Sequence, residues 1–137
     1  MASISTLRVE IAENLATIAG LRVNADGKIP ENVNPPYAIV TPTSVDYHKA
    51  FNNALNTYNF TITVVVGRAD ARSAQNTLDA YCSPTGTSSI KLAIESDKSL
   101  GGKAFDTRVS EMRNYGQVTI GEVIYLSAEF TVLCYAD

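Results

Sequence analysis

Hydrophobic residues near the start of the chain recur every three or four positions, the spacing of one face of an α-helix. They are Ile4, Leu7, Ile11, Leu15 and Ile18. Gly20 follows, and glycine often ends helices because it adopts a left-handed backbone conformation without steric cost. The spacing therefore predicts an amphipathic helix that ends at Gly20.

Two later segments alternate between apolar and polar residues, the pattern of a β-strand with one buried face. They are residues 58–66 and residues 124–134. An apolar run at residues 37–41 predicts another buried strand, ended by Pro42 because proline cannot donate a hydrogen bond to a neighbouring strand. Residues 21–23 are compatible with a short strand before it. The aromatic residues expected in the core are Tyr58, Phe60 and Phe130.

Helical spacing returns after the first alternating strand. Asp70 is placed to cap a second helix, since its side chain can accept hydrogen bonds from the first turn. The inner face of that helix is expected to hold Ala71, Ala74, Leu78 and Tyr81. Ser88 or Ser89 then begins a short third helix.

Residues 104–115 combine alternating charge with few apolar side chains, which indicates a strand at the sheet edge or with one exposed face. Turns around Gly116 and Gly121 lead into the final strand. This order of elements predicts an α+β fold, a mainly antiparallel β-sheet packed against an N-terminal helix and two central helices. With 137 residues, the chain has the size of one domain, residues 1–137.

The chain carries a net charge of −3, and only 18% of its residues are charged. The negative balance argues against an autonomous nucleic-acid-binding protein, which needs a basic surface to replace the counterions of the phosphates. The low share of charge leaves a surface rich in uncharged polar residues. Such a surface is easily desolvated in protein contacts, which favours an oligomer.

Two cysteines, Cys82 and Cys134, are too few for a disulfide framework. The first residues lack the pattern of a secretory signal, so we expect reduced thiols in a cytoplasmic protein. No apolar run approaches the ~20 residues of a membrane-spanning helix, so we expect no membrane contact.

Residues that carry catalysis or bind metals are scarce. His48 is the single histidine, and nucleophilic catalysis or a zinc site would have to use it without suitably spaced partners. Gly101, Gly102 and Lys103 match part of a phosphate-binding loop but lack its other glycine and its following Ser or Thr. We therefore expect no catalytic residue, no metal and no cofactor, and an assembly protein rather than an enzyme. A small ligand-binding or enzymatic domain stays open as an alternative, and it would need a concave pocket with converging polar groups.

Residues 44–56 fit neither the helical nor the strand spacing, and they mix aromatic with polar side chains. Such a segment is typical of a loop or an extended hairpin that contacts a partner. Parts of the terminal hairpin have a similar polar context. The residues expected at interfaces are Asp46, Tyr47, His48, Phe51 and Asn53 in this segment, and Arg108, Arg113 and Tyr115 in the terminal hairpin.

Several segments follow one another in a recognisable order. After the N-terminal helix come PPYAIV at residues 35–40, YNFTITVVVGR at residues 58–68 and DARSAQ at residues 70–75. The short helix after Ser89, a turn at residues 100–102 and a long closing hairpin complete the order. This layout, over nearly the whole chain, resembles that of the tail terminator proteins of long-tailed (siphovirus-type) bacteriophages and of related minor tail and neck proteins.

The resemblance implies a virion protein that forms a homohexameric ring, assembled in the host cytoplasm. The ring would cap the tail tube protein, stop its polymerisation and offer its other face to the head–tail connector of the neck. DNA would pass through its lumen without specific binding. Another phage tail or neck protein, namely a tail tube, tail completion or head closure protein, is the nearest alternative.

Overall fold

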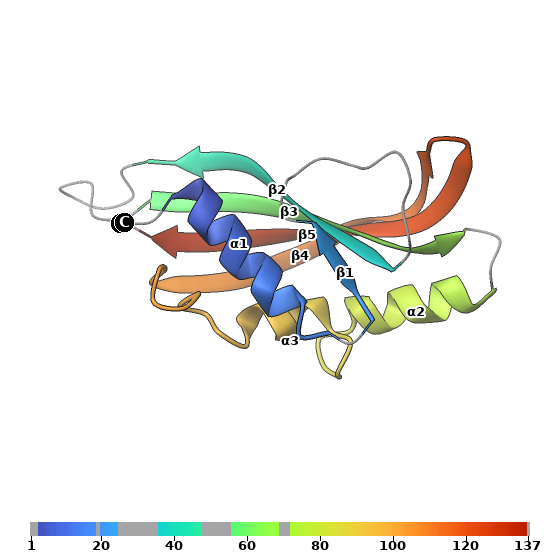
Figure 1. Ribbon diagram of the computed structural model, residues 1–137, viewed down its shortest axis with the longest axis horizontal. Helices are drawn as coiled ribbons and strands as arrows, with labels where there is room; N and C mark the ends of the chain where they lie inside the picture. The colour runs from blue at the N-terminus through green and yellow to red at the C-terminus, as the bar shows by residue number, and fades with distance from the viewer. Residues whose placement is uncertain (1–2, 19, 25–35, 48–55, 69–71, 137) are drawn as a thin grey trace.

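The computed structural model describes residues 3–18, 20–24, 36–47, 56–68 and 72–136. These residues form one five-stranded sheet and three helices, so the expected α+β fold is confirmed (Figure 1). The strands are β1 (Arg22–Asn24), β2 (Tyr37–Asp46), β3 (Asn56–Arg68), β4 (Asp106–Ile120) and β5 (Val123–Ala136). The helices are α1 (Ile4–Leu15), α2 (Arg72–Cys82) and α3 (Ile90–Glu95).

The strands lie in the order β1-β2-β3-β5-β4. β1 runs parallel to β2, and every other neighbouring pair is antiparallel. The central strands β3 and β5 are the two alternating segments, and their apolar residues share one face of the sheet. Within the described residues, β4 forms one edge of this sheet, as expected for a strand with few apolar side chains.

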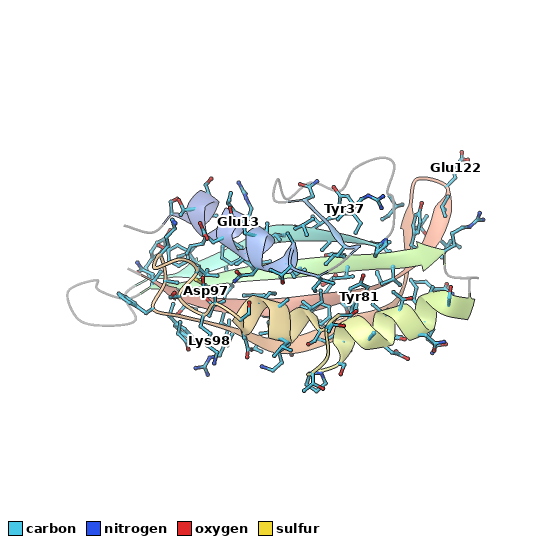
Figure 2. All side chains as sticks on the ribbon, turned by 60° about the horizontal axis from the view of Figure 1, so that its bottom comes forward. Glu13, Tyr37, Tyr81, Asp97, Lys98 and Glu122 are labelled. Atoms are coloured by element: carbon cyan, nitrogen blue, oxygen red, sulfur yellow. The ribbon has the colours of Figure 1, made fainter. Side chains whose placement is uncertain are left out.

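All three helices pack against the apolar face of the sheet and share a single core with it (Figure 1). Serine caps begin α1 and α3, where Ser3 accepts the Thr6 N–H and Ser89 accepts the Leu92 N–H. Figure 2 shows Tyr81 between α2 and the sheet, and this ring is buried. The expected core aromatics Tyr58, Phe60 and Phe130 are all buried.

The opposite face of the sheet has no helix over it in the described part of the chain. A second, smaller cluster lies there, where Val65 and Ile120 are buried against Tyr37, Val118 and Tyr125. It forms because the end of the β4–β5 hairpin bends over this face. Figure 2 shows Glu122 at the tip of that hairpin, away from the helices.

The expectation that Pro42 ends its strand is wrong, since β2 continues through it to Asp46. β1 pairs only with Tyr37, Ala38 and Ile39 of β2. Further along β2, the described residues place a neighbour on one side only, and a bulge lies between Pro42 and Ser44. A proline is tolerated there because an edge strand with a bulge does not need that N–H in its ladder.

Two other boundaries differ from expectation, and one predicted boundary lies outside the described residues. α1 ends at Leu15 rather than Gly20, and Ile18 is nonetheless buried in the turn that follows. Gly116 lies inside β4, opposite Ser127, so only Gly121 marks the hairpin turn. The predicted cap Asp70 and Ala71 lie outside the described residues, whereas Ala74, Leu78 and Tyr81 are buried as predicted.

Candidate assembly surface

The edge strand β4 is the longest strand, at 15 residues. Within the described residues it pairs on one side only, with β5. An edge strand presents unpaired backbone N–H and C=O groups, which makes it a template for a further strand. β4 is therefore the first candidate for a contact with another chain.

Two irregularities shape β4. The pairing with β5 shifts between Val109 and Glu111, and again between Arg113 and Gly116. At the second shift Asn114 has a positive φ of 55°, a conformation that asparagine tolerates better than most residues. Its side-chain amide donates to Glu129 at 3.1 Å, which holds the bulge against β5.

The first shift has a consequence for charge. Each of the four charged residues of β4 lies opposite a residue of β5: Asp106 opposite Tyr135, Arg108 opposite Leu133, Glu111 opposite Thr131 and Arg113 opposite Glu129. These four β5 residues alternate with the buried Phe130, Val132 and Cys134, so they lie on the face away from the helices. The extra residue Ser110 therefore places all four charged side chains of β4 on that same face.

Arginines on this face have carboxylate neighbours. Arg108 pairs with Asp106 at 3.1 Å, and its guanidinium lies 5.8 Å from the centre of the Tyr135 ring. The hydrogen bond from Arg108 holds the pKa of Asp106 below its ordinary value. Arg113 lies 4.0 Å from Glu129. The face therefore alternates positive and negative charge rather than forming a basic patch.

On the helix side, α3 holds β4 at its first bulge. Glu95 accepts a hydrogen bond from the Val109 N–H at 3.0 Å and forms an ion pair with Lys91, which lies one helical turn earlier in α3. Burial of the carboxyl opposes its ionisation, but the bonds from Lys91 and Val109 outweigh burial and lower the pKa of Glu95. Glu95 thus bonds to the backbone of β4 at the first bulge.

A pocket of about 160 Å³ opens between the helices and β4 beside this ion pair. Its lining is Cys82, Pro84, Lys91, Val109, Ser110, Glu111, Met112 and Phe130. Burial and the nearby Asp79 raise the pKa of the Cys82 thiol to about 11, so this thiol is protonated at neutral pH. A cavity of ~150 Å³ holds one benzene-sized group, so the pocket has room for a single side chain.

The interface residues predicted from sequence fall into three groups. Asp46 and Tyr47 lie at the end of β2, where Asp46 is exposed and Tyr47 is 66% exposed. Arg108 and Arg113 lie on the exposed face of β4. Tyr115 donates a hydrogen bond to Asp79 of α2. His48, Phe51 and Asn53 lie outside the described residues.

The structure brings some of these residues to the same end of the sheet. Asp46 pairs with Thr57, Thr57 with Tyr135, and Tyr135 with Asp106. This row crosses four strands, so Asp46 lies about 14 Å from Asp106, the distance of three strand spacings. Arg108 is near this end, whereas Arg113 and Tyr115 lie further along β4.

Sequence reasoning missed three residues of the surface. Phe105 precedes β4 and is 66% exposed, and Met112 on β4 is 39% exposed. Their flanking charges are the only sequence signal for exposure. Glu95 had no signal beyond its helical spacing to Lys91, because its contact with Val109 arises only in the folded chain.

Among the described residues, no group of three or more His, Cys, Asp or Glu side chains could hold a metal ion. No helix in the described ranges is long and apolar enough to cross a membrane. Cys82 and Cys134 are both free thiols.

Neither a scan against models of known protein families nor a search of curated proteins finds a match to this chain.

Proposed function

We propose that this chain is a tail terminator protein of a long-tailed bacteriophage. In this proposal, copies of the chain form a ring that caps the tail tube, stops its polymerisation and joins the tail to the neck. The observation that carries the proposal is that, within the described residues, the sheet has two different open edges. One is β4, and the other is the half of β2 from Val40 to Asp46, which lies beyond the three residues paired with β1.

A closed ring needs a head-to-tail contact, in which one surface of a protomer meets a different surface of the next. Two unlike edges on opposite sides of one sheet supply such a pair. β2 runs antiparallel to β4. The reason is that β3 and β5 lie between them, and each neighbouring pair from β2 to β4 is antiparallel. Repeating the protomer around an axis would therefore bring the two edges together as an antiparallel pair.

The charge pattern agrees with a lumen through which DNA passes without specific binding. In the described residues, Arg108 and Arg113 on the exposed face of β4 lie next to the carboxylates of Asp106 and Glu129. The neighbouring row of the same face carries the uncharged hydroxyls of Thr41, Thr61 and Thr131. DNA-binding proteins instead gather unopposed cations to release phosphate counterions.

Electron microscopy of the full-length protein, alone and mixed with tail tubes from the same source, tests this proposal. We expect closed rings or small soluble species for the protein alone, and one ring at the end of each tube in the mixture. Open filaments of the protein alone would instead identify a tail tube protein. Absence of rings from all tube ends would overturn the proposal.

A further inference from the structure

The charged residues of β4 are arranged so that the strand complements a second copy of itself. Along the exposed face they read Asp106, Arg108, Glu111 and Arg113, with alternating sign. In an antiparallel pair of two β4 strands centred between Val109 and Ser110, Asp106 lies opposite Arg113 of the second copy. Arg108 lies opposite Glu111 in the same register. Every charge on this face then meets the opposite charge.

This complementarity selects one register. A slip of two residues in one direction sets Asp106 against Glu111, and a slip in the other sets Arg108 against Arg113. Like charges directly opposite each other destabilise a strand pair. A slip of one residue would turn the charged side chains of one strand to the opposite face of the pair. Only the register centred between Val109 and Ser110 gives four favourable pairs.

The bulge at Ser110 is what makes the pattern possible. Without it, Asp106 and Arg108 would lie on one face of β4 and Glu111 and Arg113 on the other, because side chains alternate along a strand. Their β5 partners show that all four share the exposed face. The bulge lies at the centre of the proposed contact, so both halves of the edge present matching charges.

The helix side of the same edge contributes apolar area. Met112 is 39% exposed and, in this register, lies opposite Thr107 of the second copy. Met112 is then also a diagonal neighbour of Val109 of the second copy, and Val109 lines the 160 Å³ pocket. Because Glu95 already accepts the Val109 N–H, backbone pairing would come from the residues on either side of the centre.

We propose that two free copies of this chain associate through β4 as a two-fold symmetric dimer. The inference does not depend on the proposed tail function, since the complementarity belongs to the strand itself. It has one consequence for assembly: a β4 edge occupied in the dimer is closed to a head-to-tail neighbour. The dimer would therefore have to open before β4 could take part in a ring.

Sedimentation of the full-length protein with paired charge reversals tests the dimer. We expect the unaltered chain to dimerise, and Glu111→Arg or Arg108→Glu alone to raise the dissociation constant about tenfold or more, since each sets like charges opposite at two places. An equimolar mixture of the two variants should dimerise again, because Glu at position 108 of one copy then meets Arg at position 111 of the other. Glu122→Arg, at the hairpin tip, is the matched control and should dimerise normally.

Thermal melts followed by circular dichroism check that each variant is folded, so that weaker association is not caused by unfolding. A chain that is monomeric at all concentrations would overturn the proposal. So would a Glu111→Arg variant that dimerises as tightly as the unaltered chain, or a mixture of folded variants that stays monomeric. None of these results depends on whether rings form on tail tubes, so the two proposals fail separately.

Discussion

The hydroxyl of Tyr115 donates a 2.7 Å hydrogen bond to the Asp79 carboxylate, which links edge strand β4 to helix α2. The bulge that includes Asn114 directs Tyr115 towards the helix layer rather than away from the protein. A residue that the sequence suggests for an intermolecular contact therefore makes an intramolecular one.

Tyr115→Phe removes this bond and keeps the ring. Because Tyr115 is 39% exposed, water replaces part of what is lost, and we expect unfolding to become easier by about 1 kcal/mol. Urea denaturation measures this change in the free energy of unfolding. In a double-mutant cycle with Asp79→Ala, the two losses should not add; fully additive losses would mean that the two residues do not interact.

The same bond has a pH signature. The hydrogen bond that Tyr115 donates to Asp79 raises the pKa of Tyr115 above its ordinary value of 10.0. Since the folded pKa exceeds the unfolded one, the stabilisation is complete below pH 10 and is lost as the pH rises through the folded pKa. The stability difference between the unaltered chain and Tyr115→Phe should therefore shrink above pH 10. A difference that stays constant across that range would contradict the assignment.

Asn114 offers a test of the bulge itself. Its φ of 55° lies in the left-handed region, where a residue with a Cβ is strained by about 1–2 kcal/mol and glycine is not. Both Asn114→Ala and Asn114→Gly lose the bond to Glu129. Thermal unfolding should therefore rank Asn114→Ala as less stable than Asn114→Gly; the reverse order would show that the bulge does not have this backbone conformation.

Glu95 predicts a second pH dependence of opposite sign. The pKa of Glu95 is lowered from its ordinary 4.5, so its contribution is complete above pH 4.5 and is lost as the pH falls through the folded pKa. At pH 7, Glu95→Gln should reduce the free energy of unfolding by about 1–2 kcal/mol. The reduction should disappear in acid. Glu13→Gln on the exposed side of α1 is a control expected to have little effect.

The alternation of apolar and polar residues was sufficient to predict the core of this fold. Phe60 and Phe130 pack where the period of two places them, and the helical face of Leu7, Ile11 and Leu15 is buried as its spacing predicts. These predictions succeed because burial of a repeating apolar face dominates the choice of local structure.

Where the sequence misled, tertiary context decided the outcome. Pro42 normally ends a strand, but here it lies in the part of β2 that has a partner on only one side in the described residues. The two bulges of β4 carry no clear sequence mark, yet they determine where Arg113 and Tyr115 lie. Glu95 and Val109 are 14 residues apart, and no local spacing predicts that they meet.

The central claim, that the chain stops tail tube growth, is tested most directly by tube length. Tail tube protein from the same source would be polymerised with increasing amounts of the purified chain, and the length of each tube measured by electron microscopy. Our account predicts progressively shorter tubes with a ring at one end. Tubes of unchanged length at every concentration, without rings at their ends, would contradict it.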